Sequence, residues 1–138
     1  YSLLKKIDVK PICKLKTKIT YLKEVPKNTS IGYGQKYITN KKVKIATIPI
    51  GYADGIPRCL SDKGMVVVGN KRAKIIGNIC MDSMMIDVSN IKDVNVSDDV
   101  YIWDNKLITL DDISKWATTI NYEILSRISD RVPRIFKS

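Results

Sequence analysis

The chain has 138 residues, of which 44% are hydrophobic, so it is long enough for one domain with a buried core and is not wholly disordered. No apolar run reaches the roughly 18 residues of a transmembrane helix. The absence of histidine excludes Ser-His-Asp triads and histidine-ligated metals, so a base must be Tyr, Lys, Cys, Asp or Glu. The net charge of +10 is concentrated in residues 1–44, which carry twelve lysines against two acidic residues.

The chain up to about residue 103 predicts β-strands. Residues 13–25 alternate lysines with less polar side chains at a period of two, which is typical of a half-buried strand. Turns are predicted at 26–28 and 40–42, and a hairpin over 65–76, where Gly-Asn-Lys separates two apolar runs. The other expected elements are strands at 43–49, 84–88 and 100–103 and a loop rich in Gly, Asp and Pro at 51–58.

Helices are predicted only near the C-terminus. Thr109 supplies a capping hydroxyl, and apolar residues recur at helical spacing over 110–117. Asn121 is expected to cap a second short helix, and residues 131–136 to form an edge segment, because Pro133 cannot donate to a sheet ladder. We therefore predict a mainly β fold: an antiparallel sheet curled like a β-barrel, with two short helices near the C-terminus.

Five short blocks of the sequence combine glycine, tyrosine and charged residues in patterns that are more specific than composition. They are residues 32–37 (GYGQKY), 48–58 (IPIGYADGIPR), 79–82 (ICMD), 119–125 (TINYEIL) and 131–134 (RVPR).

In their order and spacing these blocks resemble the C-terminal domain of alanine racemases, and the resemblance covers roughly residues 9–138. It implies that residues 1–8 link this domain to an N-terminal barrel that carries pyridoxal phosphate (PLP) on a lysine. The family interconverts L- and D-alanine on PLP, which acts as an electron sink, and supplies D-alanine for peptidoglycan. The resemblance further implies a cytoplasmic bacterial homodimer with shared sites, and an isolated fragment that is inactive.

The resemblance also assigns roles to individual residues. Tyr33, between two glycines, matches the base that acts on L-alanine in the partner subunit's site. A free phenol has a pKa of about 10, so a tyrosine base needs nearby positive charge or a hydrogen-bond relay. Met81 matches the position whose backbone N–H binds the substrate carboxylate, and Tyr122 a hydroxyl that binds the PLP phosphate. The substrate entrance is matched by Tyr52, Arg58 and Asp82.

Several of these residues also have a purely structural interpretation. Tyr33 could be a strand aromatic packed in the core, Met81 a core filler, and Tyr122 an aromatic that covers the core at a helix start. Asp54 could be only a turn residue. Asn78 stands where some members of the family have Arg, which leaves the polarity of the entrance open. The preference for alanine over serine is not set by this chain alone.

Two other function classes compete with the enzyme domain. One is a small basic β-barrel that binds nucleic acid through residues 1–44, and the other is a structural or dimerisation domain. A single-strand binder needs aromatic platforms interleaved with Arg, whereas residues 1–44 contain no Arg, Phe or Trp. We therefore expect neither a nucleic-acid partner nor a membrane. The lysines then form a solvated surface or face an acidic neighbouring domain.

Overall fold

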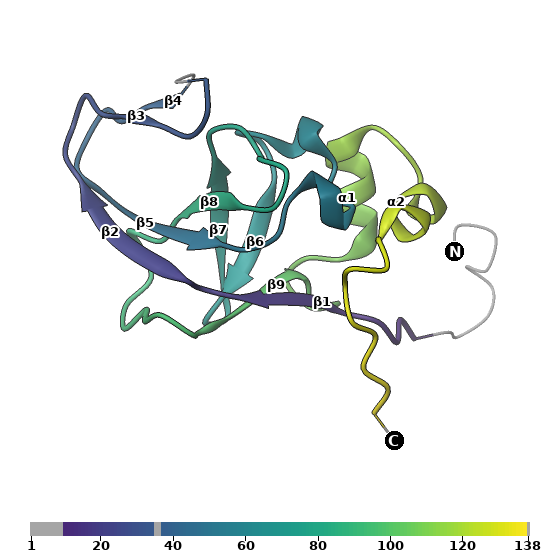
Figure 1. Ribbon diagram of the computed structural model, residues 1–138. Helices are drawn as coiled ribbons and strands as arrows, with labels where there is room; N and C mark the ends of the chain where they lie inside the picture. The colour runs from purple at the N-terminus through teal and green to yellow at the C-terminus, as the bar shows by residue number, and fades with distance from the viewer. Residues whose placement is uncertain (1–9, 35–36, 138) are drawn as a thin grey trace.

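The computed structural model of the protein describes residues 10–34 and 37–137, so the linker expected at residues 1–8 lies outside the described residues. A seven-stranded antiparallel sheet dominates the fold, with the order β1-β9-β6-β7-β8-β5-β2 (Figure 1). This architecture confirms the predicted mainly β fold with a curled sheet. Its strands are β1 (Leu15–Lys18), β2 (Tyr21–Val25), β5 (Val43–Ile48), β6 (Met65–Val68), β7 (Lys71–Ile76), β8 (Met84–Asp87) and β9 (Asp99–Trp103).

The single strand predicted over residues 13–25 is divided in two. β1 pairs with β9 and β2 pairs with β5, at the two ends of the strand order. The change of partner is marked by the Ile19 N–H, which donates to Asp98 O at 3.0 Å, and the Thr20 N–H, which donates to Thr47 O at 2.9 Å. One stretch of chain thereby forms both edges of the sheet and holds it curled. The alternation ends there, because Ile19 is buried but Tyr21 is exposed.

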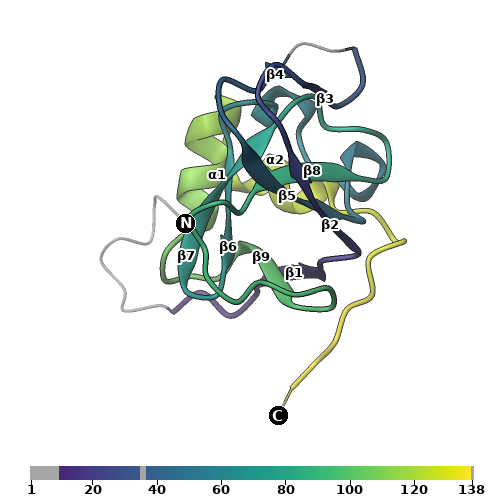
Figure 2. The same cartoon turned by 90° about the vertical axis from the view of Figure 1, so that its left-hand side faces the viewer.

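Aliphatic side chains fill the inside of the curl. The predicted hairpin is confirmed as β6 and β7, and Val66, Ile86 and Ile102 on neighbouring strands are almost completely buried. Two helices lie at one end of the sheet, behind it in the view of Figure 2, and add Ile113 and Ile124 to the same cluster. The core is therefore shared by the sheet and both helices.

The helices are α1 (Leu110–Ala117) and α2 (Asn121–Arg127). As predicted, Thr109 caps α1: its hydroxyl accepts from the Asp112 N–H at 3.2 Å, and the Asp112 carboxylate accepts from the Thr109 N–H at 2.8 Å. The prediction that Asn121 caps α2 is wrong, because Ile120 is the N-cap. Asn121 is buried, and its amide donates to Asp111 Oδ1 at 2.5 Å, which joins the two helices. None of the helices in the described part of the chain has the length and apolar character needed to cross a bilayer.

The edge segment predicted over residues 131–136 is also not formed as a strand. The guanidinium of Arg134 donates to the carbonyl oxygens of Ile128, Ser129 and Val132 at 2.7–2.9 Å. The Arg134 side chain thus reaches back to the residues that follow α2, while the segment itself runs away from the helix and forms no strand (Figure 1).

Candidate active site

Tyr33 lies at the tip of a small hairpin formed by β3 (Ser30–Ile31) and β4 (Tyr37–Ile38) (Figure 1). Gly32 and Gly34 have φ angles of +79° and +81°, values that glycine adopts without the steric cost of a Cβ. The Tyr33 side chain is 81% exposed, so the core interpretation of this residue is wrong. The hairpin presents the phenol outward.

The base of this hairpin is fixed to the sheet. Thr39 is completely buried, and its hydroxyl donates to Pro26 O at 2.7 Å and accepts from the Thr29 N–H at 2.9 Å. Ile31, two residues before Tyr33, is buried in a second apolar cluster. The exposed phenol therefore stands on an anchored backbone. The buried members of the cluster are Val25, Ile31, Val43, Ile45 and Ile76.

Met81 lies in the segment that connects β7 to β8. The preceding residues of this segment are held by side chains: the Gly77 N–H donates to Asp62 Oδ1 at 2.6 Å, and the Ile79 N–H donates to Ser61 Oγ at 3.0 Å. Met81 is 54% exposed, so it is not a core filler. Its backbone N–H has no hydrogen-bond partner among the described residues. A fixed loop thus presents an available donor.

The predicted loop at 51–58 packs directly on the Met81 segment. The Tyr52 N–H donates to Cys80 O at 3.0 Å, and the Ala53 N–H donates to Met81 O at 2.8 Å. A Cβ on Gly51 would lie 2.2 Å from Cys80 O, so this approach requires glycine. These contacts bring two of the predicted functional residues, Tyr52 and Met81, side by side.

Asp54 holds the same loop in shape, which confirms its interpretation as a turn residue. Its buried carboxylate accepts from the Gly51 N–H at 2.9 Å. It also pairs with Arg131 at 3.5 Å, and its carbonyl oxygen accepts from the Ser129 N–H at 3.2 Å. The first arginine of the RVPR block therefore anchors the C-terminal segment to this loop.

Tyr52 and Arg58, both predicted to line the entrance, lie at the wall of one hollow of about 400 Å³. Arg127 at the end of α2 adds a second positive charge to this hollow. Arg127 was not predicted as a site residue, because its only local signal in the sequence is the spacing of four residues from Glu123, which is typical of a surface ion pair. The lining consists of Tyr52, Gly55, Ile56, Arg58 and Arg127.

Helix α2 carries both Tyr122 and Arg127. Tyr122 is 57% exposed on the first turn, so most of its ring does not cover the core. A Cβ on Gly55 would lie 2.3 Å from Arg127 O, which shows how tightly the end of α2 packs on the entrance loop. The hydroxyl of Thr119 and the charge of Arg127 lower the pKa of Glu123, whose carboxylate pairs with Arg127 at 2.5 Å.

Asn78 does not contribute to the open surface of the entrance. Its side chain is buried, and its amide Nδ2 donates to the backbone carbonyl of Tyr33 at 2.7 Å. Asn78 thus links the hairpin of Tyr33 to the segment of Met81. Asp82, which follows Met81, is exposed to solvent.

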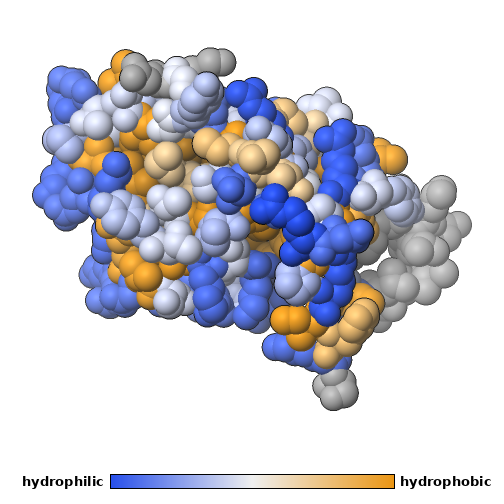
Figure 3. Space-filling model, in the orientation of Figure 1, coloured by the Kyte–Doolittle hydropathy of each residue, from blue (hydrophilic) through white to orange (hydrophobic). Residues whose placement is uncertain are grey.

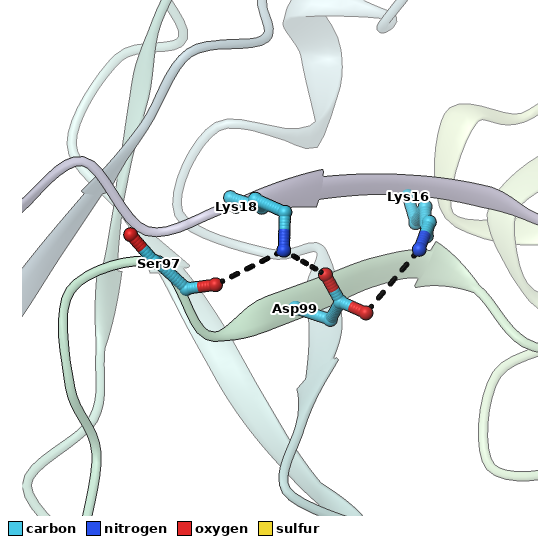
Figure 4. Close-up of polar contacts among 4 residues, drawn as sticks. All are labelled: Lys16, Lys18, Ser97 and Asp99. Carbon is cyan, nitrogen blue, oxygen red and sulfur yellow. Dashed lines mark hydrogen bonds and ion pairs between the residues drawn. The ribbon is translucent and has the colours of Figure 1, made fainter.

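Part of the lysine-rich surface is balanced by the protein's own carboxylates. Asp99 on β9 pairs with Lys18 at 2.8 Å and with Lys16 at 3.3 Å on β1 (Figure 4). The hydrogen bond from Lys18 lowers the pKa of Asp99, and with the hydrogen bond and charge of Lys16 it outweighs the opposing effect of burial. Glu24 likewise pairs with Lys42 at 2.7 Å. Hydrophilic residues still gather at the left-hand edge, over the far end of β2 and the turn after it (Figure 3).

The family model for the C-terminal domain of alanine racemase matches residues 12–136. The alanine racemase of Halothermothrix orenii is 52% identical over 140 residues, which cover 99% of this chain and 37% of that protein. Among solved structures, the alanine racemase of Streptomyces lavendulae matches with a TM-score of 0.88 and 34% identity over 96% of this chain and 35% of its own. The Bartonella henselae enzyme, solved with covalently bound pyridoxal phosphate, matches with a TM-score of 0.85 and 32% identity over 88% and 34%.

The chain spans little more than a third of the length of these relatives. The matched part includes the tyrosine hairpin, the Met81 segment, the entrance loop and α2. The chain therefore belongs to the alanine racemase family, and it corresponds to the C-terminal domain of that family.

Proposed function

We propose that this chain is the C-terminal domain of a PLP-dependent alanine racemase, in which Tyr33 is the base that acts on L-alanine. The observation that carries the proposal is an 81% exposed phenol on an anchored hairpin whose tip is bonded to the neighbouring segment. Tyr33 lies in the turn between β3 and β4, and packing within this domain does not account for an aromatic side chain held so far out of the core. The names of the relatives support alanine as the substrate.

In this proposal the phenolic oxygen of Tyr33 takes the Cα proton of L-alanine and returns it in the reverse direction. A base acts only when its oxygen is within hydrogen-bond reach of the proton, so the anchored hairpin sets its position. PLP, when bound, withdraws electrons from the substrate and makes the Cα proton acidic. The positive charge or hydrogen-bond relay that a tyrosine base needs comes from the N-terminal domain in this proposal.

The Met81 N–H binds the substrate carboxylate. A backbone donor to a carboxylate forms a charge-assisted bond, and its direction depends on the loop and not on the methionine side chain. That loop is fixed by Ser61 and Asp62 on one side and by the Tyr52 and Ala53 N–H groups on the other. The carboxylate is thereby held at a defined place relative to the base.

In this proposal Tyr122, which is 57% exposed on the first turn of α2, contributes its hydroxyl to the binding of the PLP phosphate, and the rest of the cofactor lies in the N-terminal domain. Tyr52, Arg58 and Asp82 form the substrate entrance. A hollow with both arginine and tyrosine at its wall admits a small zwitterion more readily than a bulky or cationic amino acid.

The site is completed by other parts of a longer protein. We propose that the N-terminal domain supplies the lysine that holds PLP, and that Tyr33 and Met81 face the N-terminal barrel of a second subunit in a homodimer. Their exposure supports this arrangement. The relatives named above come from bacteria, and we propose that the whole protein is a cytoplasmic enzyme that supplies D-alanine for peptidoglycan. The 138 residues alone are then inactive.

The decisive experiment is Tyr33→Phe in the full-length enzyme, with D-alanine formation from L-alanine followed by circular dichroism. Loss of the only basic atom of the side chain should lower kcat by about a hundredfold or more. Tyr21→Phe is the matched control, because Tyr21 is also exposed but lies on β2 and should leave the rate unchanged. Unchanged racemisation in both directions by folded Tyr33→Phe enzyme would show that the base is another residue.

A further inference from the structure

Asn78 occupies an unusual place between the two parts of the site. It follows Gly77 at the end of β7, it is only 9% exposed, and its amide donates to the Tyr33 carbonyl at 2.7 Å. The two residues are separated by 45 positions in the sequence. A buried amide that bonds to a distant main-chain carbonyl fixes the relative position of the two segments.

The segment that carries Asn78 is held on both sides of this residue. The Gly77 N–H is bonded to the Asp62 carboxylate, and the Ile79 N–H to the Ser61 hydroxyl. The Tyr33 turn, by contrast, passes through two glycines with positive φ. Glycine can adopt more backbone conformations than any other residue, so these two positions do not by themselves fix the shape of the turn. The Asn78 amide therefore ties the turn between the two glycines to a segment whose backbone is held on both sides.

The fit between the two segments is close enough to select the length of the side chain. A Cβ on Gly34 would lie 3.2 Å from Asn78 Nδ2, and a Cβ on Gly32 would lie 3.3 Å from the backbone nitrogen of Asn78. A longer side chain at position 78 would have to push the turn away or leave this space. The two glycines beside Tyr33 thus allow the turn to close on the Asn78 amide.

Asn78 is also three residues before Met81 in the same held segment. The segment therefore presents the Met81 N–H on one side and grips the main chain of Tyr33 on the other. We propose that Asn78 is a positioning residue for Tyr33, which sets the distance between the phenolic base and the donor to the substrate carboxylate. This inference rests on the proposed function and adds to it the residue that aligns the two groups.

The test compares Asn78→Asp with Asn70→Asp in the full-length enzyme. Asn78→Asp keeps the size of the side chain but removes its donor and places a carboxylate against a carbonyl oxygen. Because misplacement of a reacting group by about 1 Å costs up to about a hundredfold, kcat should fall by about tenfold or more, with KM for alanine nearly unchanged. Asn70 is exposed in the turn between β6 and β7, outside the site. Asn70→Asp makes the same chemical change there and should alter neither kcat nor KM.

Two readouts separate positioning from general damage. The primary isotope effect with L-alanine deuterated at Cα should rise in Asn78→Asp, while the effect with deuterated D-alanine should not. Independently of activity, amide hydrogen exchange of residues 31–34 should become faster in Asn78→Asp and stay unchanged in Asn70→Asp.

The proposal is overturned if folded Asn78→Asp enzyme keeps its kcat, or loses activity without a directional isotope effect or faster exchange at residues 31–34. If Asn78→Asp does not fold, Asn78→Ala, which removes the amide without adding charge, replaces it in the same measurements. Failure of both variants to fold would overturn the proposal and leave Asn78 with a structural role only. Inactive Tyr33→Phe together with unimpaired Asn78→Asp would retain the proposed function and reject this inference. Fully active Tyr33→Phe would reject the function itself.

Discussion

The contact between Gly51 and the Met81 segment predicts a large effect for Gly51→Ala. The backbone at Gly51 has a φ of −151°, which alanine adopts freely, so the substitution tests space and not backbone conformation. The new Cβ would lie 2.2 Å from Cys80 O and 2.7 Å from Met81 C and O. Since real Cβ contacts stay above 3.0 Å, one of the two segments must move by about 0.8 Å.

The expected cost can be built from these contacts. Overpacking of a closed site costs about 1–3 kcal/mol. The movement also weakens the hydrogen bonds from the Tyr52 and Ala53 N–H groups, each of which contributes about 1 kcal/mol. We therefore expect Gly51→Ala to lower the free energy of unfolding by about 2–5 kcal/mol, a large part of the 5–15 kcal/mol typical of a domain.

Urea denaturation followed by tryptophan fluorescence, to which the buried Trp103 contributes, measures this loss. Gly69→Ala is the complementary control: its Cβ meets only Ile91 at 3.8 Å, but its φ of +54° is unfavourable for alanine and should cost about 1 kcal/mol. A loss below about 1 kcal/mol for Gly51→Ala, or a greater loss for Gly69→Ala, would refute the steric reasoning.

Two further predictions concern carboxylates outside the site. Burial raises the pKa of Asp104, but hydrogen bonds from the N–H groups of residues 106–108, at 2.9–3.0 Å, outweigh it and lower the pKa below its usual value. Its stabilising contribution is therefore present above pH 3.8 and is lost as the pH falls through the lowered pKa. Asp104→Ala should lower the free energy of unfolding by about 2–3 kcal/mol at pH 7. Denaturation at a series of pH values should show that this deficit shrinks in acid. A deficit independent of pH would contradict this. Lys18→Met, which removes an exposed partner of Asp99, should change the free energy of unfolding by less than about 1 kcal/mol, and thermal melts in low and high salt should show the small effect vanish in salt.

Most of the secondary structure could be predicted from local signals in the sequence. The hairpin of β6 and β7 and the cap of α1 at Thr109 depend on residues only a few positions apart, so their patterns are complete within a short window. The functional blocks were likewise visible, because Tyr33 and Met81 lie in short, specific patterns. Their exposure could not be predicted, because a tyrosine or methionine in the core has the same sequence letter as one on the surface.

The errors arose where contacts formed in the folded chain outweighed the local sequence pattern. Asn121 has the side chain of a helix cap, but the nearby Asp111 carboxylate gives its buried amide a better partner. Residues 131–136 were predicted as an edge strand, but the Arg134 guanidinium binds three carbonyl oxygens of residues 128–132 and the segment pairs with no strand. The strand predicted over 13–25 divides because the curled sheet needs one segment to pair with β9 and then with β5.

Periodicity and short motifs are properties of neighbouring residues, so they were enough to predict the mainly β class, the late helices and the residues proposed for the site. Three contacts could be found only in the folded chain: Asn78 binds the Tyr33 turn, Gly51 lets the entrance loop pack on Met81, and Arg127 joins Arg58 at one hollow. Each of these contacts joins residues far apart in the chain. Their energies depend on distances that exist only after the sheet has curled and the helices have packed against its end.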